Sequence, residues 1–445
     1  MEIEMDMEDW EKQSIYQLTT SITELNEKAY IPQAVSFGPY HHGKAHLLPM
    51  EKHKERAMRH FLKRSNKPRQ VLIDSLAEVV KDLKSSYAVL PTEWQEDDDK
   101  FIQLMILDGC FMLEILHSYE KTPKDYASSD PIFSSHGKLY MIPYMRRDML
   151  MLENQLPMLV LERLLACEAG PNDEDNKRLN ELILKLFSPN DKVTPALGKC
   201  LHVLELYRKN LLDGNTDSRV VKGSSGGVII PSATELDEAG IRFRKSKTTS
   251  LEDISFKCGI LKFPPITVDD GTESMFLNLM AFERYHNGAG NQVTSYIFFM
   301  DNIIDTEKDV ALLESRDIID NALGSDKAVV ELFSTLSKDI SVDSDNKLHV
   351  VQNNVKEYYK KFWNRWRATL FHTYCRNPWV LISLVAAIFL FAVTIVQTVY
   401  TVYPYYKNNS PGPPPAVPPP PPLPPPPMLN PPPPVSRRGG FHRHI

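Results

Sequence analysis

The longest run of apolar residues lies near the C-terminal end of the chain, from residue 379 to residue 403, and contains no charged side chain. A helix over this run would be roughly 37 Å long, whereas the hydrocarbon core of a bilayer is about 30 Å thick. Trp379 and Tyr403 lie at its two ends, where membrane interfaces favour aromatic side chains. We therefore predict a transmembrane helix over residues 379–403. A buried core helix is the alternative, but a basic run and a proline tract flank the stretch.

Before this run, apolar residues recur mostly at spacings of three and four, which is the period of an amphipathic helix. The pattern predicts helices over residues 11–28, 49–63, 70–86, 101–117, 147–165, 175–187, 197–213, 272–285, 295–304, 307–323 and 328–336. Pro157 interrupts the stretch 147–165, and a proline inside a helix removes a backbone donor at a cost of about 3 kcal/mol. We therefore expect a break near Asn154 and Gln155.

Between residues 228 and 263 the pattern changes to short apolar runs bounded by turn residues. The runs are 228–230, 241–243, 254–256 and 259–263, and they predict a small antiparallel sheet. A loop rich in Gly, Ser and Asp precedes them at 214–227. The fold class is thus mainly α with a small antiparallel β element, followed by one C-terminal transmembrane helix and a disordered polyproline tail.

These patterns divide the chain into five segments. They are a disordered acidic N-terminus (1–13), a globular helical head (14–354), a basic juxtamembrane helix (355–378), the transmembrane helix (379–403) and a proline-rich tail (404–445). The N-terminus lacks the apolar core of a signal peptide, so we expect the transmembrane helix itself to direct membrane insertion.

Charge is distributed unevenly along the chain. The formal net charge is −6 for the whole chain and −15 for residues 1–354, because the remainder carries ten cations and one acid. An acidic head without a basic stripe argues against a nucleic-acid partner. Most of these cations precede the transmembrane helix, so the positive-inside rule places the head in the cytosol. Five widely spaced cysteines agree with a reducing compartment, and we predict a single-pass protein of the plasma membrane.

In the juxtamembrane segment, aromatic residues alternate with cations, as they do in helices that lie at a membrane surface. Each cation near an anionic leaflet contributes about 1 kcal/mol of attraction. The residues expected to contact lipid headgroups are Lys360, Lys361, Arg365 and Arg367. A solvated basic helix that packs on the head is the alternative.

Known enzyme motifs fit this sequence poorly. Residues 223–227 match the letters of G-x-S-x-G, but a loop leads into them and the strand–turn–helix of a nucleophile elbow is not predicted there. Four histidines, at positions 42, 46, 53 and 60, have spacings that could align them for a metal, yet Pro49 interrupts the helix. We therefore predict no cofactor and no enzymatic activity. The alternative is an enzyme with an unrecognised site in the head, built from Asp108, Glu153, Glu283 and His286.

Polar residues at the predicted break lie between two strongly apolar runs. Burial would force Glu153, Asn154 and Gln155 to find hydrogen-bond partners, or cost about 1–3 kcal/mol for each unpaired group. Our hypothesis is a buried structural clasp that joins them to Arg284 and His286, or to Arg147.

The tail after the transmembrane helix is dominated by proline, which favours the extended polyproline II conformation. Its central run resembles ligands of profilin, SH3 or WW domains, with Pro418, Leu423 and Pro427 as the expected contacts. A cytosolic tail would therefore act as an adaptor ligand, whereas a tail outside the cell could contact wall polymers or wall proteins. An inert spacer is the third alternative.

Six segments, taken together and in this order, resemble the plant domain of unknown function 247 family. They are VSFGPYHHG (35–43), MEKHK (50–54), MILDGCF (105–111), DMLMLENQLP (148–157), SATELDEAGI (232–241) and NLMAFERYH (278–286). The resemblance covers about residues 14–403 and implies a mostly helical, membrane-anchored plant protein with no established catalytic residues. Some grass members are implicated in self-incompatibility recognition, and the long proline tract is not part of the family pattern. We predict non-catalytic protein recognition or signalling at a membrane, with the lipid bilayer and an unknown protein as partners.

Overall fold

The computed structural model describes residues 12–24, 26–120, 125–169, 175–187, 197–213, 229–338, 340, 347–360 and 378–408. The chain divides into two compact units between Thr373 and Tyr374. We use "head" for the described residues 12–360. The second unit is represented by residues 378–408.

The N-terminal part of the head is helical and is built around one long buried helix. Its helices are α2 (Thr20–Thr23), η1 (Glu27–Ala29), α3 (Leu48–Ser65), α4 (Arg69–Ala77), α5 (Val80–Ser85), α6 (Thr92–Gln95), α7 (Asp98–Glu120), α8 (Ser135–Tyr140), α9 (Ile142–Met149), α10 (Met158–Ala169), α11 (Asp175–Phe187) and α12 (Val203–Leu212). Helices α3, α4, α10 and α11 all pack on α7, most of whose side chains are buried. Gly109 allows this packing, because a Cβ there would lie 2.5 Å from Leu164.

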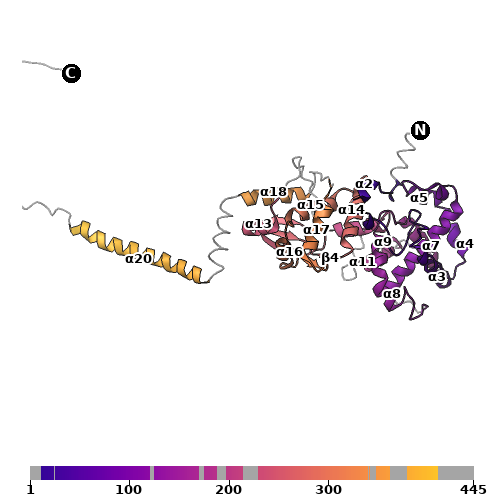
Figure 1. Ribbon diagram of the computed structural model, residues 1–445, viewed down its shortest axis with the longest axis horizontal. Helices are drawn as coiled ribbons and strands as arrows, with labels where there is room; N and C mark the ends of the chain where they lie inside the picture. The colour runs from indigo at the N-terminus through magenta and orange to yellow at the C-terminus, as the bar shows by residue number, and fades with distance from the viewer. Residues whose placement is uncertain are drawn as a thin grey trace, which may run out of the picture. The chain divides into compact units, whose positions relative to one another are not determined.

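The C-terminal part of the head contains α13 (Ala233–Glu238), α14 (Thr272–Tyr285), α15 (Gln292–Ile303), α16 (Glu307–Glu314), α17 (Asp326–Leu336) and α18 (Lys347–Lys360). Its strands are β1 (Arg242–Lys245), β2 (Ser255–Lys257), β3 (Ile260–Phe263), β4 (Ile266–Val268) and β5 (Ile319–Asn321). Figure 1 shows the N-terminal helices, in indigo and magenta, at one end of the head and the C-terminal helices, in orange, at the other. One hydrophobic core runs through both parts.

The strands form two small sheets. Among the predicted runs, the antiparallel arrangement is confirmed for one pair and wrong for the other, residues 229–230 form no strand, and β4 and β5 were not predicted. Strand β3 lies between β1 and β2, parallel to β1 and antiparallel to β2, while β4 and β5 form a separate parallel pair. Only β2 and β3 are joined by a tight turn, at Cys258 and Gly259, which both have positive φ. A tight turn reverses the chain direction, whereas the longer connections leave the direction to tertiary packing.

Several helix predictions were too long. The helix predicted over 197–213 begins only at Val203, and the one predicted over 70–86 is divided between α4 and α5. Residues 11–28 do not form one helix, because the segment around Ile15 bonds to the chain after α5: the Ile15 amide donates to Ser86 O and the Ala88 amide donates to Ile15 O, both at 2.9 Å. The stretch 307–323 is helical only to Glu314, after which Asp317, with φ of 55°, turns the chain into β5. The break at Pro157 is confirmed, since α9 ends at Met149 and α10 begins at Met158.

The second unit contains helix α20 (Pro378–Asn408), whose residues 385–403 are long and apolar enough to cross a membrane and are not buried in the protein. Helix α7 passes the same test of length and composition, but it is mostly buried and serves as the core of the head. Several predictions lie outside the described residues: the acidic N-terminus up to residue 11, the loop 214–227, the lipid contacts Lys361, Arg365 and Arg367, and the tail contacts Pro418, Leu423 and Pro427. Lys360 is the last residue of α18.

A buried polar network and a candidate recognition cleft

The segment 33–38 crosses the head interior in an irregular conformation, and buried side chains accept its backbone N–H groups. The Asp148 carboxylate accepts the amides of residues 33, 34 and 35 at 2.6–3.0 Å. Asn154 Oδ1 accepts the Phe37 amide at 2.7 Å, and Asp108 Oδ2 accepts the Gly38 amide at 2.8 Å. These three acceptors replace the regular secondary structure that buried backbone otherwise requires.

Asp108 also forms an ion pair with Lys54 in which both side chains are fully buried. The Lys54 ammonium lies 2.7 Å from Asp108 Oδ1, 2.7 Å from Glu51 Oε1 and 3.1 Å from Ser36 Oγ. Burial raises the pKa of Asp108, and the nearby Lys54 charge opposes this shift. The pair therefore fastens α3 to α7 beneath segment 33–38. Lys54 and Asp108 lie in segments 50–54 and 105–111, which carry the family resemblance, but the sequence does not show that the two residues form a pair.

The amides of Asn154 and Gln155 are buried and fully used. Asn154 Nδ2 donates to the carbonyls of Val35 and Asp148, each at 3.0 Å. Gln155 Nε2 donates to the carbonyls of Met149 and Met151 at 2.6 and 2.7 Å, and its Oε1 accepts the Leu204 amide at 3.2 Å. Both side chains thus bond to backbone groups around the break between α9 and α10, rather than to Arg284 or His286.

The other residues of the hypothesised clasp have different partners. Glu153 accepts the Leu18 amide at 2.6 Å and lies 3.2 Å from His41 Nε2. Arg147 donates to Lys28 O at 2.6 Å, and His286 Nδ1 lies 3.0 Å from the Tyr16 hydroxyl. Arg284 lies in the last turn of α14 and interacts electrostatically with Tyr30. These residues fasten the N-terminal segment 16–41 to the head at several separate points.

The four residues of the alternative enzyme site likewise take part in different sets of contacts. Asp108 forms an ion pair with Lys54. Glu153 contacts Leu18 and His41, and His286 contacts Tyr16. Glu283 lies 2.6 Å from Arg208 and accepts the amides of Val293 and Thr294 at 2.9 Å, so it caps the first turn of α15. Arg208, one of two adjacent cations in the amphipathic helix α12, gave no signal in the sequence. Within the described ranges, no group of three or more His, Cys, Asp or Glu side chains is placed to hold a metal ion.

His202 caps helix α12 and should make the folding stability of the protein depend on pH. Its Nδ1 accepts the Glu205 amide at 3.2 Å and its Nε2 donates to Ser14 O at 3.0 Å, a pattern that only neutral imidazole can make. Burial lowers its pKa to about 4. In the unfolded chain the His202 imidazole has its usual pKa of about 6.5 and therefore binds a proton more tightly than in the folded protein. The contribution of neutral His202 to folding stability is thus fully present above about pH 6.5 and falls by about 3 kcal/mol as the pH approaches 4.

The prediction is tested by urea unfolding of the full-length protein in detergent from pH 7 to pH 4, with His202→Asn as the comparison. Asparagine keeps an acceptor for the cap but does not titrate, so the difference in stability between the two proteins should shrink on acidification. The comparison is needed because burial raises the pKa of Asp148 to about 6, so that protonation of Asp148 stabilises the folded protein as the pH falls and opposes the effect of His202. A difference that does not vary with pH would contradict the assignment.

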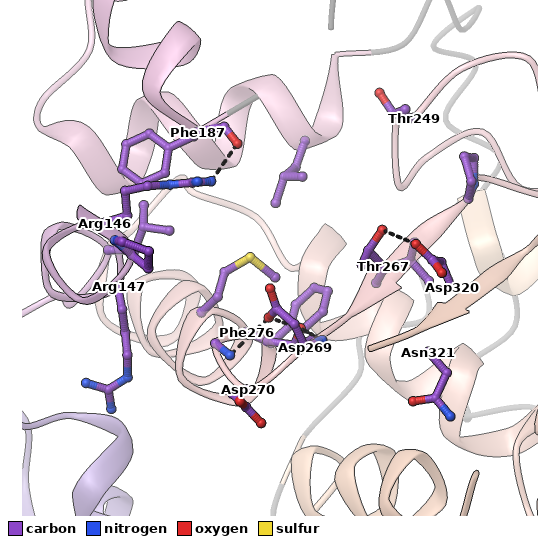
Figure 2. Close-up of a pocket in the computed structure, with 18 of the residues that line it drawn as sticks. Arg146, Arg147, Phe187, Thr249, Thr267, Asp269, Asp270, Phe276, Asp320 and Asn321 are labelled. Atoms are coloured by element: carbon purple, nitrogen blue, oxygen red, sulfur yellow. Dashed lines mark hydrogen bonds between the residues drawn. The ribbon is translucent and has the colours of Figure 1, made fainter. Parts of the chain in front are cut away.

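A large open cleft lies on the head beside one edge of the polar network, where Gln33 and Arg147 line it. Its volume is about 1410 Å³, larger than the roughly 300–1,000 Å³ of most small-molecule pockets. Helices α8 and α9 form one wall, and β4, β5, the turn before α14 and the turn after α16 form the other. Figure 2 shows Arg146 and Arg147 on the first wall and Thr267 and Asp320 on the second. Of the predicted clasp and enzyme residues, only Arg147 is among the described residues that line the cleft.

The wall formed by α8 and α9 exposes large apolar side chains. Leu139 is 65% exposed, Tyr140 57% and Tyr144 52%. They are brought together by a break between the helices: Ser134 caps α8 by accepting the Gly137 amide, and Pro143 starts α9. Neighbouring exposed apolar residues of this size are unusual on a soluble surface and commonly mark an interaction site. The cleft left no signal in the sequence, because its walls are over 100 residues apart in the chain.

Comparison with known sequences gives the family. The model of DUF247, described as plant protein of unknown function, matches residues 15–393. The chain belongs to the DUF247 family. This confirms the predicted resemblance, and four of the DUF247 segments quoted above, 35–43, 50–54, 105–111 and 148–157, meet in the buried polar network.

Two proteins of Arabidopsis thaliana are similar to this DUF247 chain over most of its length. UPF0481 protein At3g47200 is 32% identical over 423 residues, which cover 88% of this chain and 86% of the relative. Putative UPF0481 protein At3g02645 is 21% identical over 484 residues, which cover 86% and 89%. No solved structure gives a significant match.

Proposed function

We propose that this DUF247 protein is a membrane-anchored recognition protein, without catalytic activity of its own, whose head binds a segment of a partner protein in the cleft. The observation that carries the proposal is the open cleft with Leu139, Tyr140 and Tyr144 exposed along one wall. A cleft of this size accommodates a polypeptide segment, and aromatic side chains are the most frequent anchors of protein interfaces.

The proposed absence of catalytic activity is supported by the polar residues discussed above, because their side chains are already hydrogen-bonded or ion-paired within the head. Asp108, Glu283 and His286 use their polar atoms in bonds that hold helices and the N-terminal segment together. A general acid or base needs to reach a substrate, and the cleft does not include these residues. No specific observation favours the alternative of an enzyme, and the proposed adaptor role of the proline tail lies outside the described residues.

The membrane part of the proposal rests on the length, apolarity and exposure of α20 and on the cations that precede it. In this proposal α20 anchors the protein in the plasma membrane and the head faces the cytosol. Protease treatment of sealed right-side-out plasma-membrane vesicles, with tags at both chain ends, should digest the C-terminal tag and leave the N-terminal tag protected. Protection of the C-terminal tag in inside-out vesicles with digestion of the N-terminal tag is the expected result. The reverse pattern would place the head outside the cytosol.

Recognition is tested with full-length protein in lipid nanodiscs and fluorescent peptides from a mixed-sequence pool. We expect a subset of peptides to bind, and Tyr144→Ser to weaken their binding by about tenfold, since a buried aromatic anchor contributes about 1–2 kcal/mol or more. Tyr119→Ser is the matched control, because Tyr119 is also exposed but lies outside the cleft. Equal effects of the two substitutions, or an absence of binding peptides, would contradict the proposal.

A further inference from the structure

The wall of the cleft that faces α8 and α9 is strongly acidic. Five carboxylate side chains line it: Asp269, Asp270, Glu314, Asp317 and Asp320. Across the described ranges of the chain, none of the five forms a salt bridge. Asp269 accepts the Gly271 amide and the Thr272 hydroxyl, and Asp320 accepts the Thr267 hydroxyl at 3.3 Å. Their negative charge is therefore not neutralised by a cation of the described head.

The cations that line the cleft are mostly committed elsewhere. Arg146 donates to Phe187 O at 2.9 Å and its guanidinium lies 5.7 Å from the Phe187 ring. Arg147 donates to Lys28 O and Ile31 O, which fixes the N-terminal segment. Lys245 is exposed at the edge of β1. Five carboxylates thus face a space with three cations, two of which already bind backbone carbonyls.

We propose that the cleft binds a cationic, extended polypeptide segment in which basic and apolar residues alternate. This inference rests on the proposed function and names the chemical class of the partner. Side chains of an extended chain point alternately to opposite sides, so basic residues would meet the acidic wall while apolar residues meet Leu139, Tyr140 and Tyr144. The choice of a basic occupant follows from charge complementarity between the cleft and its ligand.

Arginine suits such a site better than lysine. Its guanidinium binds carboxylates with two parallel hydrogen bonds and also stacks on tyrosine rings. Individual ion pairs at an exposed site contribute little, but several charges of one sign act together on partner choice and on the rate of association. Binding should consequently weaken as salt rises, because the carboxylates are open to solvent.

The test uses full-length protein in nanodiscs made of uncharged lipid and three labelled nonapeptides. In the first, arginine alternates with leucine; in the second and third, glutamine or glutamate replaces every arginine. We expect the arginine peptide to bind at least about tenfold more tightly than the glutamine peptide at about 50 mM NaCl, and the glutamate peptide to bind most weakly. Tyr144→Ser should weaken the arginine peptide as well, since both walls contribute.

The matched variants remove the same amount of charge at two places. The cleft variant carries Asp270→Asn, Asp317→Asn and Asp320→Asn, which preserve shape and, at position 317, the tolerance for positive φ. The control variant carries Glu55→Gln, Glu96→Gln and Asp99→Asn at exposed positions outside the cleft. The cleft variant should lose about tenfold in affinity for the arginine peptide, whereas the control variant should change it less than about twofold.

Each other outcome overturns the inference in a recognisable way. Equal loss in both triple variants would show non-specific attraction to an acidic head. Tighter, Tyr144-dependent binding of the glutamine or glutamate peptide would overturn the basic partner while leaving the recognition cleft in place. If no peptide of any charge binds in a manner that depends on Tyr144, the proposed function fails together with the inference.

Discussion

Replacing Lys54 with methionine is expected to destabilise the head by about 3–5 kcal/mol, because it leaves the Asp108 carboxylate buried without its cation. This is a large part of the roughly 5–15 kcal/mol by which domains are usually stable. The change keeps the length and most of the volume of the side chain, so loss of packing contributes little. Urea unfolding of detergent-solubilised full-length protein, followed by near-ultraviolet circular dichroism, measures the effect.

The double variant Lys54→Met/Asp108→Asn separates the buried charge from other causes. Asparagine at position 108 still offers an oxygen to the Gly38 amide, and no uncompensated charge remains. We expect it to recover more than half of the stability lost in the single variant, since replacing both members of a buried pair is often close to neutral. A double variant as unstable as Lys54→Met would show that the fold needs the ion pair for another reason.

Replacing Asn154 with leucine is expected to cost about 3–5 kcal/mol. The substitution leaves the buried Phe37 amide and the Val35 carbonyl without their partner, while the Asp148 carbonyl loses one donor but keeps the Met151 amide. Each unpaired buried group costs about 1–3 kcal/mol, and leucine supplies some apolar burial in return. The midpoint of thermal unfolding of the full-length protein, followed by circular dichroism, is the measurement.

Asn354→Leu is the matched control for this substitution. Asn354 is exposed on α18, and leucine has a higher helix propensity than asparagine, so the control should be neutral or slightly stabilising. An unchanged unfolding midpoint for Asn154→Leu would mean that segment 33–38 finds other partners and would remove the structural role assigned to Asn154.

Part of the candidate site was readable from the sequence. Polar residues between apolar runs, as at Asn154 and Gln155, must be satisfied if they are buried, and the structure bonds both of them. Their partners could not be predicted, because nearly every residue has a backbone amide and a carbonyl, and the sequence does not show that those of residues 35–37 lie beside these side chains. The same limit applies to Lys54 and Asp108, which are separated by 54 positions, and to Arg208 and Glu283.

The sequence by itself determined the features that depend on near neighbours in the chain. Helical periodicity located α3, α7, α11 and α14; Pro157 fixed the break between α9 and α10, because it cannot continue a helix; and the uncharged run identified α20. Tertiary structure decided what depends on distant segments. It held residues 14 and 15 in an extended conformation beside Ser86, set β1 parallel to β3, and brought α8 and α9 opposite β4 and β5 to form the cleft. These outcomes follow from which surfaces meet in space, where long-range hydrogen bonds and burial outweigh local preference.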